Sequence, residues 1–174
     1  GANLAALAAG ETGIGRCSYL STVHADDFPV GEVKFSNAEL ASICNWAGTN
    51  SRSAMLSFIA AREALEDSGF LKDNPYRTGF ISATSVGGMD LTEEFYPAFL
   101  QDRQAGKLRQ VVQHECGAIT ERVAKALQIS HYVTTISTAC SSAANAIMLA
   151  ARMIRHGLLD VAVAGGTDAL SKFT

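Results

Sequence analysis

The sequence predicts an α/β fold in which helices cover a largely buried sheet. Three short runs rich in apolar residues are typical of strands, at 77–84, 132–136 and 159–164. Segments whose apolar residues recur at helical spacing alternate with these runs along the chain. Strands that alternate with helices usually pair in parallel, and the connecting helices then cover the faces of the sheet. We therefore expect a layered α/β fold.

Size and charge narrow the classes of protein to which the chain can belong. Its 174 residues, 48% of them hydrophobic, suit a single domain with a substantial core. A formal net charge of −3, with no cluster of Lys or Arg, argues against a surface that binds nucleic acid. No apolar run has the length of a membrane span, and no segment resembles a cleaved export signal. We therefore expect that the chain does not bind nucleic acid and does not span a membrane.

The cysteines predict the redox environment. Cys17, Cys44, Cys116 and Cys140 are widely spaced and include no CxxC pair. The pattern therefore indicates neither a zinc site nor a disulfide framework, and we predict no bound metal. Such unpaired cysteines suit the reducing cytoplasm, which is the predicted location.

The sequence predicts little regular structure in the first 35 residues. Residues 3–9 are too few to form a stable isolated helix and are expected to end an element whose beginning is absent. Residues 11–35 are expected to form a surface connection with short extended pieces, because glycine and proline recur in them. The glycines at 10, 13 and 15 raise the alternative of a phosphate-binding loop. That alternative is disfavoured because no strand precedes them and no Lys-Ser or Lys-Thr pair follows.

The first clear helix is predicted over 51–68. One face carries apolar residues at helical spacing, Ser51 or Ser53 is a suitable N-cap, and Gly69 ends the helix. We expect this helix to pack on the sheet. A turn at 73–75 then leads into the strand at 77–84.

The segment after that strand begins with a sharp turn at Gly87 and Gly88. A helix is predicted over 90–104, interrupted at Pro97 and bearing an aromatic patch. The run 114–117, His-Glu-Cys-Gly, precedes a predicted helix at 118–127 and raises the question of a metal site. Adjacent residues of one element point in different directions and no second half-site is visible, so we expect none. The other histidines are isolated and are predicted to lie at the surface or in caps.

The chemically most informative stretch is a strand, helix and strand with a cysteine at the first turn. The strand at 132–136 turns sharply through 137–139 onto Cys140, and an Ala-rich helix follows at once. Small and apolar residues occupy nearly all positions of this helix, so we expect a buried helix at the centre of the fold. His156 and Gly157 end it, and the strand at 159–164 then runs into a Gly-Gly pair.

A thiol at a helix N-terminus is chemically suited to nucleophilic attack. The unpaired N–H groups of the first turn and the positive end of the helix dipole favour the thiolate. Small neighbours on both sides of Cys140 leave room for an acyl group. The same N–H groups are able to receive an oxyanion in acyl transfer. The alternative is a buried structural cysteine, because free cysteine is among the most buried residue types.

The motif 138–142, Thr-Ala-Cys-Ser-Ser, resembles the nucleophile region of the β-ketoacyl-acyl-carrier-protein synthases, elongating condensing enzymes of the thiolase-like superfamily. The likeness extends through the Ala-rich helix to the run Gly165-Gly166-Thr167-Asp168. The strand at 77–84 with the glycine turn at 85–89 resembles the family's corresponding strand and turn, and 7–14 is similar to its early helix end. The resemblance implies a thiolase-like layered fold in which residues 1–174 form approximately the first of two similar halves. It further implies that the first strand and the second half are absent, and that 85–117 is a channel-lining and dimer-forming insertion.

The resemblance also implies a reaction. Cys140 is expected to be the catalytic nucleophile that takes an acyl group from an acyl carrier protein, and its N–H to supply part of the oxyanion hole. Condensation with a malonyl-carrier, with loss of carbon dioxide, gives a 3-oxoacyl product in fatty acid or polyketide biosynthesis. Val86 is expected near the acyl channel. No bound cofactor is implied, because phosphopantetheine on the carrier holds the substrates. The family's two histidines lie in later motifs that this chain lacks, so we expect it to be inactive alone.

Partners and alternatives follow from the same resemblance. The expected partners are an acyl carrier protein and a second subunit, in a homodimer or a ketosynthase-like heterodimer. One alternative is a coenzyme A-dependent thiolase or starter condensing enzyme, and another is a non-catalytic ketosynthase-like partner subunit. An α/β-hydrolase with a cysteine nucleophile is disfavoured, because Thr138 and Ser142 stand where its G-x-S-x-G turn has glycines.

Overall fold

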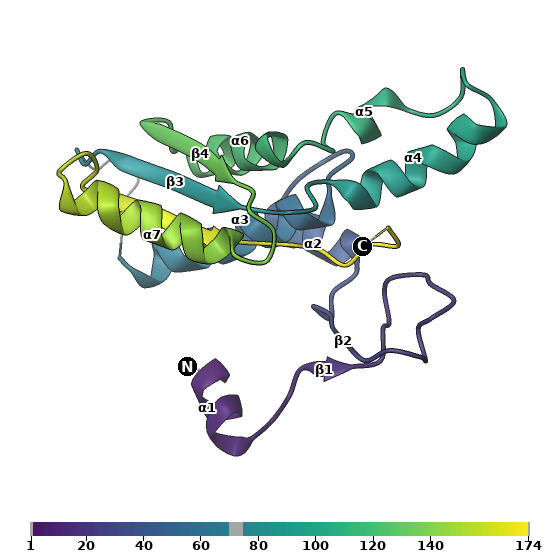
Figure 1. Cartoon of the computed structure of the whole chain (residues 1–174), viewed down its shortest axis with the longest axis horizontal. Coiled ribbons are helices and arrows are strands. Elements are labelled where there is room, and N and C mark those ends of the chain that lie inside the picture. The colour runs from purple at the N-terminus through teal and green to yellow at the C-terminus, as the bar shows by residue number, and fades with distance from the viewer. Residues whose placement is uncertain (1, 70–74, 174) are drawn as a thin grey trace. The chain divides into compact units, whose positions relative to one another are not determined.

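The computed structural model describes residues 2–69 and 75–173 and divides into two compact units, one ending at Ser36 and one beginning at Asn37 (Figure 1). Most of the turn predicted at 73–75 lies outside the described residues.

The first unit contains little regular structure, as predicted for residues 11–35. Helix α1 spans Ala2–Ala9 and has no buried residue. Strands β1, Ile14–Gly15, and β2, Val30–Gly31, form a short antiparallel pair. These are the short extended pieces expected within the surface connection.

Glu32 organises the loop between these two strands. Its carboxylate accepts hydrogen bonds from the backbone N–H groups of Ser18 at 2.8 Å, Tyr19 at 2.9 Å and Leu20 at 3.2 Å. The Lys34 ammonium lies 2.8 Å from the same carboxylate. Burial by itself raises the pKa of Glu32, but Lys34 and the three N–H groups outweigh burial and lower this pKa to about 2.

We expect the loop at 16–20 to loosen in acid. The folded pKa of Glu32 lies below its ordinary value, so the ionised carboxylate stabilises the loop above pH 4.5, and this stability is lost as pH falls toward about 2. The amide resonances of Ser18 and Tyr19, followed by NMR from pH 6 to pH 2, should therefore shift with a midpoint well below 4.5. In Glu32→Gln the shift should be absent. A wild-type midpoint near 4.5 would show that the carboxylate is not held as described.

The second unit is built on a three-stranded parallel sheet. The strands are β3 at Thr78–Ala83, β4 at Tyr132–Ile136 and β5 at Val161–Gly166, in the spatial order β4-β3-β5. The three predicted strands are confirmed, with β5 displaced by two residues toward the C-terminus. Every residue of β3 is buried, whereas β4 and most of β5 are half-buried because each has only one neighbouring strand among the described residues. The expectation of a largely buried sheet therefore holds for β3 and only in part for β4 and β5.

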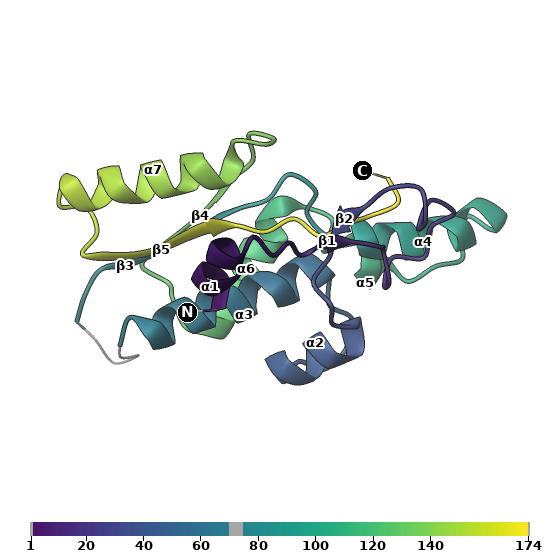
Figure 2. The ribbon, with the colours of Figure 1, turned by 90° about the horizontal axis from the view of Figure 1, so that it is seen from below.

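Helices cover both faces of the sheet (Figure 2). Helix α3, Arg52–Asp67, and helix α6, Cys116–Leu127, lie on one face, and helix α7, Ser142–Arg155, lies on the other. The core follows this division, since Phe80 of β3 packs with Met55 of α3 and Val123 of α6, while the next residue, Ile81, packs on α7. Adjacent strand residues point to opposite faces, so one strand serves both layers.

Helix α3 agrees closely with its prediction. The Ser51 side chain accepts a hydrogen bond from the Ala54 N–H at 3.3 Å and caps the helix, as expected. Helix α6 begins two residues before the predicted start. Two short helices were not predicted, namely α2 at Asn37–Cys44 and α5 at Leu108–Val111.

The structure corrects the predictions for two other helices. Helix α4, Met89–Gln101, continues through Pro97, so the predicted interruption is wrong. Pro97 is exposed, and water can hydrate the carbonyl that loses its intrahelical donor. Helix α7 is covered on one face only, because Ile147, Met148 and Ile154 are exposed. The expectation that this helix is buried on nearly every side is therefore not met among the described residues. None of the described helices combines the length and apolar character needed to cross a membrane.

Candidate active site

The carboxyl ends of the three parallel strands carry the loops that surround Cys140. The β4–α7 loop holds Cys140 itself, β3 leads into a turn at Thr84–Gly87, and β5 leads to Asp168. Parallel strands place these loops at the same edge of the sheet. Backbone hydrogen bonds join the ends of the three strands. The Thr84 N–H donates to the Ile136 carbonyl, and the Thr167 N–H donates to the Ala83 carbonyl.

Cys140 is exposed and lies two residues before the first residue of α7. Its exposure contradicts the alternative of a buried structural cysteine, which fits Cys17 and Cys44 instead. Cys140 follows Ala139, whose φ of +52° lies in the left-handed region. This conformation costs an alanine about 1–2 kcal/mol, so neighbouring contacts must hold it.

Ser142 supplies part of that support. Its hydroxyl donates to the Ala139 carbonyl at 2.6 Å and accepts from the Thr138 N–H at 2.8 Å. Its backbone N–H donates to the same carbonyl at 3.0 Å. The Ser142 side chain is buried, which limits the access of water to its hydroxyl. Ser142 thus closes the turn around Cys140.

Asn145 and Ser141 hold the other side of the loop. The Asn145 amide donates to the Thr138 hydroxyl at 2.8 Å, and the Ser141 hydroxyl donates to the Thr138 carbonyl at 2.8 Å. Ser141 occupies the N-cap position of α7 but makes no side-chain cap bond. The polar residues of the motif therefore fix the loop rather than the helix end.

The turn after β3 contacts this loop through Ser85. The Ser85 hydroxyl donates to the Ala139 carbonyl at 3.1 Å. The turn itself is built on Asp168, whose Oδ1 accepts from the Thr84 hydroxyl at 2.6 Å, from the Ser85 N–H at 2.8 Å and from the Val86 N–H at 3.4 Å. Val86 is half-buried in this turn, beside the Cys140 loop.

Several of these residues are given no role by the sequence alone. Ser85 and Asp168 belong to recognised motifs, but nothing local indicates that they bond to each other, because 83 residues separate them. Ala139 carries no sequence signal for a positive φ. Position 139 lies among small residues, with Ser137 and Thr138 before it and Cys140 and Ser141 after it, and this is the local hint of a tight turn.

The His-Glu-Cys run does not form a metal site in the described part of the chain. His114 Nδ1 lies 2.9 Å from the Thr92 hydroxyl, Glu115 is the N-cap of α6, and Cys116 is its first residue. Across residues 2–69 and 75–173, no three metal-ligating side chains lie close enough together to hold an ion.

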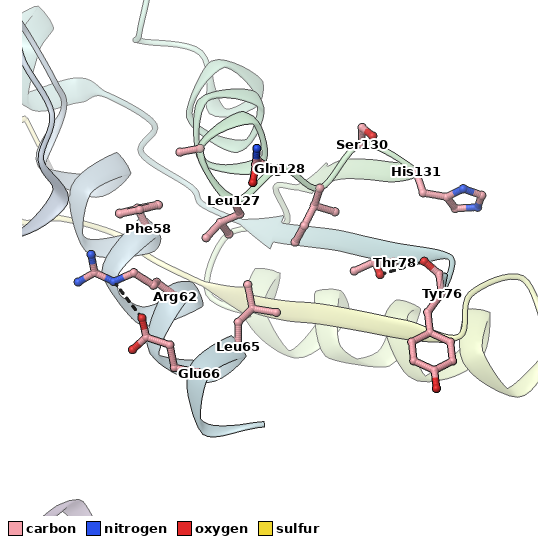
Figure 3. A pocket seen from close by; sticks show the side chains of 12 residues that line it. Phe58, Arg62, Leu65, Glu66, Tyr76, Thr78, Leu127, Gln128, Ser130 and His131 are labelled. Atoms are coloured by element: carbon pink, nitrogen blue, oxygen red, sulfur yellow. Dashed lines mark hydrogen bonds and ion pairs between the residues drawn. The ribbon is translucent and has the colours of Figure 1, made fainter. Parts of the chain in front are cut away.

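Two cavities lie away from Cys140. One, of about 300 Å³, opens between the C-terminal ends of α3 and α6 and the first residue of β3, where the Arg62–Glu66 ion pair borders it (Figure 3). This is the amino end of the strands, opposite to the Cys140 loop. The other is an open groove of about 660 Å³ beside Trp46 and Arg122. Neither is lined by Cys140.

Comparison with known proteins identifies the family of the chain. Residues 39–173 match the family model described as "Beta-ketoacyl synthase, N-terminal domain". Nodulation protein E of Rhizobium sp. (strain N33) is 36% identical over 125 residues, a match that covers 70% of this chain and 31% of that protein. The 3-oxoacyl-[acyl-carrier-protein] synthase 2 of Vibrio cholerae is 29% identical over 172 residues, covering 95% of this chain and 41% of that protein.

Solved structures agree on the fold. The ishigamide ketosynthase/chain length factor superposes with a TM-score of 0.83 at 22% identity, covering 97% of this chain and 43% of that chain. A ketosynthase in complex with its chain length factor from Xenorhabdus doucetiae gives a TM-score of 0.58 at 28% identity, covering 80% of this chain and 35% of that chain. The predicted thiolase-like α/β fold is confirmed. The chain spans about a third of the length of the curated relatives it matches, and it belongs to the β-ketoacyl synthase family, whose N-terminal domain it contains.

Proposed function

We propose that the intact protein is a 3-oxoacyl-[acyl-carrier-protein] synthase of fatty acid or polyketide biosynthesis in which Cys140 is the nucleophile. The observation that carries the proposal is the exposed thiol of Cys140, held in a hydrogen-bonded turn at the start of α7 within the segment that matches the family. Two relatives support the class of reaction. They are the 3-oxoacyl-[acyl-carrier-protein] synthase 2 of Vibrio cholerae and the tetracenomycin polyketide synthase ketoacyl synthase alpha subunit of Streptomyces glaucescens, which is 31% identical over 152 residues.

The first step is acyl transfer to the enzyme. The Cys140 sulfur attacks the carbonyl carbon of an acyl thioester carried on phosphopantetheine. A bond forms between this carbon and the Cys140 sulfur as the bond to the carrier sulfur breaks, and the departing thiolate takes up a proton. Negative charge develops on the carbonyl oxygen, and the Cys140 N–H is suited to donate a hydrogen bond to this oxyanion.

The second step lengthens the chain. A malonyl-carrier loses carbon dioxide, and the electron pair left on its carbon attacks the acyl-enzyme carbonyl. The bond to the Cys140 sulfur breaks, the departing Cys140 thiolate takes up a proton from solvent, and a 3-oxoacyl-carrier is released. By resemblance, the two histidines that assist this step lie in motifs of the family's second half. The reaction needs no cofactor bound to the enzyme, because the carrier's phosphopantetheine holds both substrates.

Val86 is proposed to border the acyl chain. It is half-buried, and it belongs to the turn whose Ser85 contacts the residue before Cys140. All four cysteines of the chain are free thiols, which supports the proposal that the reaction takes place in a reducing cytoplasm.

The proposed partners are an acyl carrier protein and a ketosynthase-like second subunit. Two structural relatives are a ketosynthase with a chain length factor, which supports a heterodimer over a homodimer. The exposed apolar residues of α7 and the half-buried flanking strands leave surface that further protein is suited to cover. If this chain is instead the non-catalytic subunit, it will dimerise but Cys140 will not be acylated.

Acylation of the intact protein tests the proposal. We expect a short acyl thioester of N-acetylcysteamine to add one acyl group per chain, located by peptide mapping on Cys140. Cys140→Ala should remove this adduct, whereas Cys116→Ala, which alters a half-buried cysteine outside the loop, should retain it. Alkylation of Cys140 by iodoacetamide without any acyl adduct would contradict the proposed function, because the thiol would then be accessible but not able to perform acyl transfer.

A further inference from the structure

Asp168 gathers three donors from one short turn onto a single oxygen. Its Oδ1 accepts from the Thr84 hydroxyl, the Ser85 N–H and the Val86 N–H. The Thr84 hydroxyl in turn accepts from the Gly87 N–H at 3.1 Å. Hydrogen bonds to a carboxylate are about twice as strong as neutral ones, so this arrangement fixes the conformation of residues 84–87.

The fixed turn places the Ser85 hydroxyl against the Ala139 carbonyl at 3.1 Å. The Ser142 hydroxyl donates to the same carbonyl at 2.6 Å. The Ala139 carbonyl belongs to the peptide group that joins Ala139 to Cys140. A trans peptide group is planar, so its carbonyl and its N–H point in opposite directions within one plane. Contacts that hold the Ala139 carbonyl therefore also set the direction of the Cys140 N–H.

The Ala139 conformation makes this support necessary. Its φ of +52° is costly for alanine, and the two hydroxyl donors, together with the Ser142 N–H at 3.0 Å, oppose rotation of the peptide group toward a more favourable conformation. We propose that Asp168, acting through Ser85, is a positioning residue that aims the Cys140 N–H at the oxyanion formed during acyl transfer. This inference rests on the proposed function, in which the Cys140 N–H is an oxyanion donor.

The sheet itself does not depend on Asp168. Gly166 of β5 pairs with Ala83 of β3, and the Thr167 N–H donates to the Ala83 carbonyl at 2.9 Å, so strand pairing ends before Asp168 begins its contacts. Asp168 and Ser85 are also exposed, so their substitution leaves no cavity in the core. Variants at these two positions are expected to fold.

Two reactions of the same thiol separate positioning from a structural role. Acylation by a thioester passes through a tetrahedral oxyanion and needs the N–H donor, whereas alkylation by iodoacetamide displaces iodide directly and needs only an accessible thiol. A misdirected Cys140 N–H therefore slows acylation selectively. A displaced or buried Cys140 slows both reactions together.

The test compares the two rate constants at Cys140 in the intact protein. In Ser85→Ala and Asp168→Ala we expect acylation by an N-acetylcysteamine thioester to fall about tenfold or more, since loss of a whole oxyanion donor costs about 10²–10³-fold. Alkylation should stay near the wild-type rate. Ser85→Thr, which keeps the hydroxyl, should recover most of the acylation rate. Asp102→Ala, at an exposed aspartate that accepts the Gln104 N–H beyond α4, is the matched control and should change neither rate.

The outcomes distinguish this inference from the proposed function. If wild-type protein is acylated but the variants lose neither rate, or lose both equally, the positioning role is overturned and the proposed function stands. If wild-type Cys140 is alkylated but never acylated, the proposed function fails and the positioning role fails with it. Selective loss of acylation, recovered in Ser85→Thr, supports the inference.

Discussion

Gly87→Ala is expected to destabilise residues 37–173 by about 3 kcal/mol or more, because two costs add at this position. The φ of Gly87 is +57°, which an alanine adopts only with strain. A Cβ at residue 87 would also overlap the backbone carbonyl oxygen of His114. Backbone cannot move aside as a flexible side chain does. The same carbonyl accepts the Gly88 N–H at 3.3 Å, so the overlap breaks a hydrogen bond as well.

Urea denaturation followed by circular dichroism measures this effect. Gly117→Ala is the matched control, because a Cβ there meets nothing within 4 Å and Gly117 lies within helix α6. Alanine in a helix is more favourable than glycine by about 1 kcal/mol, so the control should be neutral or slightly stabilised. Equal stability of the two variants would show that the turn at 84–88 does not pack against 113–116 as described.

Gly166→Ala is expected to cost about 2 kcal/mol and to displace the start of helix α7. A Cβ at residue 166 would lie 2.8 Å from the Ala143 Cβ and 3.2 Å from the Ala143 Cα. Ala143 is the second residue of α7, so the helix cannot relieve this contact by turning a side chain. Because the Cys140 loop leads directly into α7, the alkylation rate of Cys140 should change together with stability.

Two further variants make this prediction specific. A Cβ at Gly165 meets nothing within 4 Å, so Gly165→Ala should leave stability and alkylation unchanged. Adding Ala143→Gly to Gly166→Ala removes the closer of the two contacts and should restore part of the lost stability, although glycine in a helix itself costs about 1 kcal/mol. Destabilisation by Gly165→Ala equal to that by Gly166→Ala would contradict the packing of β5 against α7.

The strands and main helices were predictable because their signals are local. An apolar β-branched run marks β4, helical spacing and an N-cap serine mark α3, and a Gly-Gly pair marks the end of β5. Short α2 and α5 escaped prediction because eight and four residues provide too little periodicity. At Pro97 the local rule predicts an interruption of the helix. Helix α4 continues through Pro97 because this residue lies on an exposed face.

By itself, the sequence determined the α/β class, the position of Cys140 at the start of a helix, and the likeness to the condensing enzymes. These depend on residues close together in the chain. Only the tertiary structure decided which loops meet at Cys140, because the strand order β4-β3-β5 brings Asp168 to a turn that lies 84 residues earlier at Thr84. It also decided the strained φ of Ala139, since contacts from Ser85 and Ser142 offset the cost of a conformation that alanine does not favour on its own.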